Sequence, residues 1–152
     1  MLDPRGDRDL RRERAQLRLN AGAQALLGAR DLARSLHGRV PIAVASNNPR
    51  AFVTTALVSA GLDNFFTHMY AAEDVTNPKP APDLHLTACA ALNADPTRSI
   101  AFEDSPTGVA AARAAAMHVV GVPSLPGVTL AADTIFPSLT HPTLTHWATT
   151  VA

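Results

Sequence analysis

Short apolar runs that alternate with helix-like segments constrain the fold of this chain more than any other feature. The run at 40–45 contains no polar residue, and further strand-like segments follow at 67–71, 99–102, 119–122 and 133–136. Apolar runs without polar alternation are typical of strands buried on both faces, as in a parallel sheet. Strands that alternate with helices favour right-handed βαβ units. The sequence therefore predicts an α/β fold of three layers, in which helices cover both faces of a parallel sheet.

Helix signals separate these runs. Apolar side chains recur at i, i+3 and i+4 over 22–37, and Gly38 then ends the segment. Asn48-Pro49 and Ser105-Pro106 each predict an N-cap followed by a proline in the first helical position. The remaining predicted helices cover residues 9–20, 49–60, 82–92 and 106–116. We expect residues 1–20 to form a residual charged helix that returns to the core, residues 21–138 to form the core, and residues 139–152 to form an irregular tail.

Composition excludes several classes of protein. The 152 residues suffice for one domain, and the 47% apolar content excludes a disordered chain. Thirteen basic residues balance thirteen acidic ones, so no net charge attracts nucleic acid or an acidic membrane. The N-terminus is charged, and no apolar run is long enough to span a membrane. With a single cysteine, Cys89, the chain forms no internal disulfide, and we expect it to be cytoplasmic.

Polar residues follow three of the predicted elements. Ser46 and Asn47 end the first strand, Lys79 lies in a loop with three prolines, and Glu103-Asp104 end the strand at 99–102. Open parallel sheets bind ligands at the carboxyl ends of their strands, so we expect these three sites to converge. Each also has a simpler interpretation: a helix cap, a solvated surface lysine, and an acidic pair that starts a helix.

The chemistry of these residues suits a phosphate and a divalent cation. A hydroxyl beside a helix N-terminus favours an anion, as does an ammonium held by a stiff loop. Lys79 is the one lysine among thirteen basic residues, the other twelve being arginine, which makes a chance position at this site less plausible. Two adjacent carboxylates at a buried strand end need a cation to neutralise them, and Mg²⁺ is the expected partner of Glu103 and Asp104.

Three segments carry a resemblance to a known family. They read IAVASNNPR at 42–50, NPKPAPDLHL at 77–86 and IAFEDSPTGVAAARAAAMHVVGVP at 100–123. In this order and spacing they resemble the second, third and fourth motifs of the haloacid dehalogenase superfamily, in the branch of β-phosphoglucomutase-like phosphatases and sugar-phosphate mutases. The resemblance covers about residues 20–138. It implies a three-layer Rossmann-like core and Mg²⁺-dependent phosphoryl transfer on a small phosphorylated metabolite.

The resemblance also implies a role for each residue. Ser46, with the Asn47 backbone, would bind the transferring phosphoryl group, and Lys79 would bind both this group and the nucleophile. Asp104 and Glu103 would hold Mg²⁺. Arg50 would contact the substrate. In the family, an aspartate of a DxDxT motif forms an aspartyl-phosphate that is then hydrolysed or transferred.

This sequence lacks the DxDxT motif. Asp7-Arg8-Asp9 has the two carboxylates, but no apolar run precedes it and no hydroxyl residue follows at the required place. The nucleophile strand and most of the cap domain are therefore predicted to be missing, and the isolated chain is predicted to be inactive. Without that strand, two strand edges in the middle of the sheet lose their hydrogen-bond partners. The alternative is a non-catalytic module that binds phosphate and Mg²⁺, or that docks on a partner chain or a second copy through the open sheet.

Overall fold

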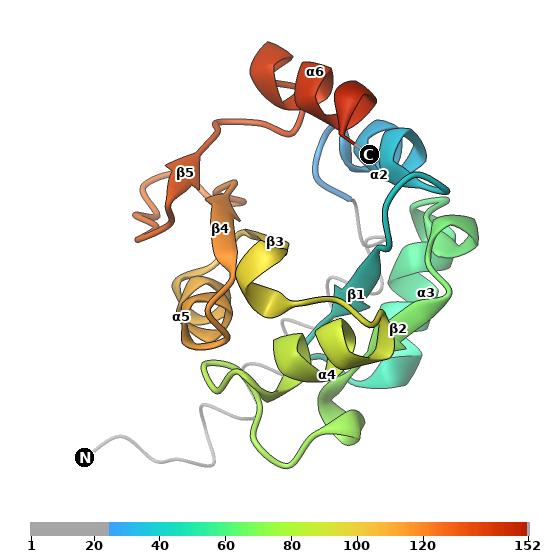
Figure 1. The fold of residues 1–152 in the computed structure, drawn as a ribbon, viewed down its shortest axis with the longest axis vertical. Coiled ribbons are helices and arrows are strands. Elements are labelled where there is room, and N and C mark those ends of the chain that lie inside the picture. The colour runs from blue at the N-terminus through green and yellow to red at the C-terminus, as the bar shows by residue number, and fades with distance from the viewer. Residues whose placement is uncertain (1–24, 152) are drawn as a thin grey trace.

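The computed structural model describes residues 25–151, so the predicted helix at 9–20 lies outside the described residues. The chain alternates helices and strands as expected (Figure 1). Helices are α2 (Ala29–Leu36), α3 (Arg50–Ser59), α4 (Asp83–Ala91), α5 (Pro106–Ala114) and α6 (Pro142–Thr150). Strands are β1 (Ala43–Ala45), β2 (His68–Tyr70), β3 (Ile100–Glu103), β4 (His118–Gly121) and β5 (Thr134–Ile135). Short 3₁₀ turns occupy Asp63–Phe65 (η1), Ala72–Asp74 (η2) and Pro96–Arg98 (η3).

The strands form two parallel sheets instead of one. β1 pairs with β2, while β3, β4 and β5 form a second sheet in that order. Within residues 25–151 no backbone ladder joins β1 to β3. The prediction of a parallel sheet with a strand missing from its middle is therefore confirmed.

Helices cover both faces of the β3–β4 pair because successive side chains of a strand point to opposite faces. Ala101 and Val119 pack on one face against Val109 of α5. On the other face, Val120 packs with Leu144 of α6, and with partly buried side chains of α2 and α6. α2 and α6 also contact each other. This half of the core therefore has three layers, with helices on both faces of the sheet, as the sequence predicts.

The prediction of an irregular tail at 139–152 is wrong, because residues Pro142–Thr150 form α6. Pro142 occupies the first turn, and the His141 side chain accepts a hydrogen bond from the Thr143 N–H. Leu144 and Ala148 are one helical turn apart and are both buried. The helical spacing was present in the sequence, but His141 is not one of the usual capping residues, so the start of the helix was missed.

The start of α3 also differs from the prediction. Pro49, and not Asn48, is the N-cap residue, and no side chain of α3 itself caps the helix. The Glu73 carboxylate instead accepts the Arg50 N–H, with nitrogen–oxygen distances of 3.0 and 3.1 Å. The predicted N-cap at Ser105 is confirmed, because its hydroxyl accepts the Gly108 N–H at 3.1 Å and Pro106 follows it. Over the described part of the chain, no helix is both long and apolar enough to cross a membrane.

Candidate phosphate-binding site

The carboxyl ends of β1 and β3 open into a pocket of about 330 Å³. Its lining includes Ser46, Asn47, Lys79, Glu103 and Asp104. These residues come from three segments separated by more than 20 residues each, and parallel strands bring them together because their carboxyl ends lie at the same edge. The predicted convergence of the three polar sites is therefore observed.

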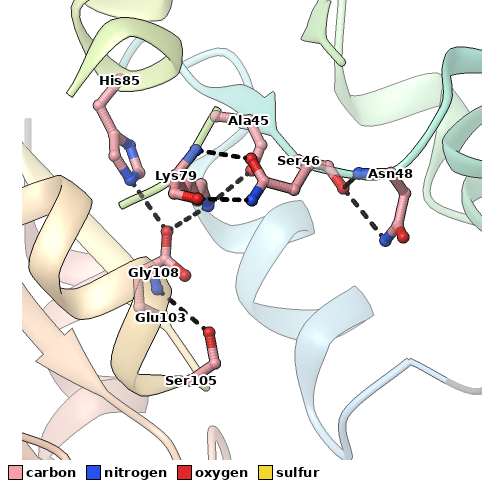
Figure 2. A network of polar contacts seen from close by, with 9 residues as sticks. Ala45, Ser46, Asn48, Lys79, His85, Glu103, Ser105 and Gly108 are labelled. Atoms are coloured by element: carbon pink, nitrogen blue, oxygen red, sulfur yellow. Dashed lines mark hydrogen bonds and ion pairs between the residues drawn. The ribbon is translucent and has the colours of Figure 1, made fainter. Parts of the chain in front are cut away.

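Lys79 and Glu103 form a buried ion pair at the base of this pocket (Figure 2). Lys79 Nζ lies 2.6 Å from Glu103 Oε1 and donates a second hydrogen bond to the Ala45 carbonyl at 3.0 Å. Their side chains are only 9% and 8% exposed. An ammonium has three donors, so one N–H of Lys79 remains for a further acceptor.

His85 of α4 completes this cluster. Its Nε2 lies 3.0 Å from Glu103 Oε1, although the two are not aligned for a straight hydrogen bond. Burial favours the neutral acid, but the contacts with His85 and Lys79 outweigh it and hold the pKa of Glu103 below its ordinary value. No sequence spacing marks His85 as part of the site, because its partner Glu103 lies 18 residues further along the chain.

Gly108 provides the space that Glu103 occupies. A Cβ atom at Gly108 would lie 1.8 Å from Glu103 Oε2. Glycine in the first turn of α5 therefore permits the carboxylate to lie against the helix. The group that approaches this glycine closely is thus a side chain of the same pocket.

Asn47 holds the loop that carries Lys79. Its Oδ1 accepts the Lys79 N–H at 2.8 Å, and its Nδ2 donates to the Lys79 carbonyl at 3.0 Å. Ser46 Oγ accepts the backbone N–H of Asn48 at 3.1 Å (Figure 2). Ser46 keeps its own hydroxyl proton for a ligand, and the Asn47 side chain fixes the Lys79 backbone.

Arg50, predicted to contact the substrate, does not line the pocket. Its guanidinium forms an ion pair with Asp74. Its backbone N–H is taken by Glu73. Two acidic residues of η2 therefore engage Arg50 outside the pocket lining, and its contact with the substrate stays a prediction.

The two adjacent carboxylates have different environments. Glu103 is buried and engaged by Lys79 and His85, whereas Asp104 is exposed and lines the pocket. Among the described residues no group of three or more His, Cys, Asp or Glu side chains is arranged to hold a metal ion. Of the two predicted metal ligands, the structure leaves Asp104 available to a cation and gives Glu103 a different partner.

Comparison with known proteins identifies the family. The sequence profile of the haloacid dehalogenase-like hydrolases matches residues 11–122, most of the chain. The chain belongs to this family. It is 38% identical over 96 residues to validoxylamine A 7'-phosphate phosphatase of Streptomyces hygroscopicus subsp. limoneus, covering 62% of the chain and 45% of that relative. It is 39% identical over 92 residues to a fructose-1-phosphate phosphatase of Escherichia coli, covering 60% of the chain and 49% of that relative. The haloacid dehalogenase-like chain thus spans about half the length of these curated relatives.

Solved structures agree with this assignment. A haloacid dehalogenase family hydrolase from Deinococcus radiodurans R1, solved with bound phosphate and sodium, is 32% identical with a TM-score of 0.67, covering 74% of this chain and 55% of that one. CbbY from Rhodobacter sphaeroides in complex with phosphate has a TM-score of 0.75 at 23% identity, covering 96% and 71% of the two chains, which supports the fold alone. The predicted family and the α/β fold are confirmed.

Proposed function

We propose that this haloacid dehalogenase-like core forms the phosphate- and cation-binding part of a phosphoryl-transfer site that acts on a small phosphorylated metabolite. The observation that carries the proposal is the shared pocket of Ser46, Lys79 and Asp104 at the carboxyl ends of β1 and β3. Its volume of about 330 Å³ is at the lower end for small-molecule sites. The two curated relatives described above are named as phosphatases of phosphorylated small molecules, which supports this substrate class.

Three groups would stabilise the transferring phosphoryl group. Lys79 offers its remaining N–H and its positive charge, Ser46 offers its hydroxyl, and the N-terminus of α5 faces the same pocket through Thr107. Phosphoryl transfer depends mainly on positioning and on neutralising charge over the phosphoryl oxygens. Fixed donors in a partly buried pocket are suited to that task.

The donor set of the pocket suits Mg²⁺ at Asp104. Mg²⁺ binds one or two carboxylates and completes its shell with waters and phosphate oxygens, so a single free carboxylate is sufficient. Asp104 is exposed in the pocket beside the proposed phosphate site. Bound there, Mg²⁺ would supply further charge neutralisation for the phosphoryl oxygens.

The isolated chain is expected to be inactive. Two carboxylates line the pocket among the described residues. Glu103 is held in its ion pair with Lys79, and Asp104 is assigned to the cation. No described carboxylate of the pocket therefore remains to act as a nucleophile. With para-nitrophenyl phosphate and Mg²⁺, we expect the release of nitrophenol at the rate of a protein-free blank. Turnover well above the blank that is lost in Asp7→Asn would contradict this expectation, because it would identify Asp7 as a nucleophile.

Phosphate binding tests the proposed site directly. We expect inorganic phosphate to shift the amide resonances of Ser46, Asn47, Thr107 and Gly108, and Ser46→Ala to weaken binding by about tenfold or more, since hydrogen bonds to a charged group contribute about 1.5–3 kcal/mol. Ser35→Ala is the matched control, because the Ser35 hydroxyl bonds the Asp31 carbonyl on the exposed surface of α2.

The variant Asp104→Asn tests the binding of the cation separately from the binding of phosphate. In this variant we expect phosphate alone to bind as in the parent chain, and added Mg²⁺ to give no further increase in affinity. Equal phosphate affinity in the parent, Ser46→Ala and Ser35→Ala chains would contradict the proposed phosphate site.

A further inference from the structure

The two most buried polar residues in the part of the chain that the structure describes face each other. They are His85 of α4 and Glu103 of β3. The other buried residues of α4 are Leu84, Ala88 and Cys89, so His85 lies on the side of the helix that packs into the core. A buried polar group costs free energy unless it has a partner, so a histidine at this position needs a physical reason.

The His85 ring contacts the Glu103 carboxylate and not the phosphate pocket. Its Nε2 lies 3.0 Å from Glu103 Oε1 (Figure 2). Among residues 25–151, this Nε2 is the one buried side-chain nitrogen or oxygen without an aligned hydrogen-bond partner. His85 is not among the residues that line the pocket. An effect of His85 on a bound phosphate would therefore have to pass through Glu103.

Two donors face the same oxygen of Glu103. Lys79 Nζ lies 2.6 Å from Oε1, and His85 Nε2 lies 3.0 Å from this atom. An ionised carboxylate only accepts hydrogen bonds, so Nε2 is a ring nitrogen that carries a proton. The other oxygen, Oε2, occupies the space where a Cβ atom at Gly108 would stand. The carboxylate is thus held between α4 and α5.

The position of Glu103 Oε1 sets the direction of the Lys79 ammonium. Nζ donates to Oε1 and to the Ala45 carbonyl, and the Asn47 side chain fixes the Lys79 backbone. Once two of its three N–H groups have partners, the tetrahedral geometry of an ammonium fixes the direction of the third. This third N–H is the one that serves a phosphate, so a rotation of the carboxylate would turn it away.

We infer that His85 is a positioning residue of the phosphate site: its Nε2–H holds Glu103 Oε1 in place, and Glu103 thereby directs the free N–H of Lys79 toward the phosphoryl group. The inference rests on the proposed function of the pocket. The contact is not straight in the ligand-free chain, and such contacts often tighten when the ligand binds. In metal sites, loss of a residue that orients a direct ligand costs about 10- to 100-fold in affinity, and we expect the lower end here.

Nuclear magnetic resonance on the full 152-residue chain tests this coupling. Inorganic phosphate is titrated at constant pH without Mg²⁺, and the histidine ring nitrogens are followed together with the pocket amides. We expect the His85 Nε2 resonance to shift with the same Kd as the amides of Ser46 and Thr107. His37 is the control, because its Nδ1 bonds the Phe65 carbonyl on the exposed surface, and its ring resonances should not shift.

Two substitutions at position 85 separate positioning from packing. His85→Leu removes the donor and keeps the position apolar, so phosphate should bind about tenfold more weakly. His85→Gln keeps an N–H donor at the end of a side chain of similar reach, so its affinity should stay close to that of the parent chain. A purely structural role predicts the opposite order, because leucine is the better core residue. His37→Leu is the matched control and should bind phosphate as the parent chain does.

The path through Lys79 predicts that effects on phosphate affinity combine differently in two backgrounds. In Lys79→Met the ammonium is absent, so His85→Leu should not weaken phosphate binding any further. In Ser46→Ala the ammonium remains, so His85→Leu should still weaken binding about tenfold.

Failure of the proposed function and failure of this inference give different results. Pocket amides that do not shift with phosphate would overturn the proposed function, and the role of His85 with it. Pocket amides that shift while the His85 ring nitrogens do not would overturn the inference alone, and this result needs no variant to fold. Equal phosphate affinity in His85→Leu and the parent chain, or equal weakening in His85→Leu and His85→Gln, would also overturn it. So would a tenfold effect of His85→Leu that persists in Lys79→Met.

Discussion

Lys79→Met is expected to lower the free energy of unfolding by about 3–5 kcal/mol, the usual cost of removing one partner from a buried ion pair. Glu103 would remain buried with only His85 beside it, since its side chain is 8% exposed. Methionine is chosen because its unbranched side chain can fill the space of the lysine stem. Urea unfolding at neutral pH measures the change from the midpoint and slope.

Two variants control this experiment. Lys79→Met with Glu103→Gln removes both charges and should recover much of the loss, because no uncompensated charge remains. Arg34→Met breaks the exposed pair with Asp31, whose side chains are 59% and 78% exposed, and should change stability by less than about 1 kcal/mol. Equal effects of Lys79→Met and Arg34→Met would contradict the assignment of a buried, energetically important pair.

The pH dependence of stability gives a second measurement of the same pair. The pKa of Glu103 is lowered in the folded chain by His85 and Lys79, against the opposing effect of burial. The carboxylate therefore contributes stability above its unfolded pKa, and this contribution is lost as the pH falls through its folded pKa. Glu103→Gln should remove this part of the acid destabilisation.

The parts of the site that the sequence predicted are those fixed by strand topology. Ser46 and Asp104 each follow a parallel strand, and Lys79 lies in a loop after another strand. They converge because the carboxyl ends of parallel strands share an edge. The Ser105-Pro106 cap could also be predicted from the sequence, because the capping hydroxyl and its partner Gly108 are three residues apart. The positions of these residues can therefore be predicted from the spacing of nearby residues and from the order of strands along the chain.

The parts that were missed depend on contacts between distant side chains. His85 reaches Glu103 from α4, and Asp74 of η2 forms an ion pair with Arg50. Asn47 bonds the backbone of Lys79, 32 residues further along the chain. None of these pairs has a fixed sequence spacing, so each was visible only once the helices and turns were placed.

Gly108→Ala is expected to destabilise the chain by about 2–4 kcal/mol, the combined range for overpacking and for disturbing a buried ion pair. In an ordinary helix the same change would stabilise by up to about 1 kcal/mol. Here the added Cβ would lie 1.8 Å from Glu103 Oε2 and 2.5 Å from its Cδ. The carboxylate must move, which would disturb the contacts that its Oε1 makes with Lys79 and His85. Chemical denaturation measures the difference.

A double-mutant cycle with Glu103→Ala decides whether the cost of Gly108→Ala arises from this contact. Without the Glu103 carboxylate the added Cβ has space, so Gly108→Ala should become neutral or stabilising by up to about 1 kcal/mol. The coupling between the two positions should then be about 3 kcal/mol, near the upper end for residues in contact. If alanine at 108 costs the same in both backgrounds, its effect comes from the backbone of α5, and Gly108 does not serve to accommodate the buried carboxylate of the pocket.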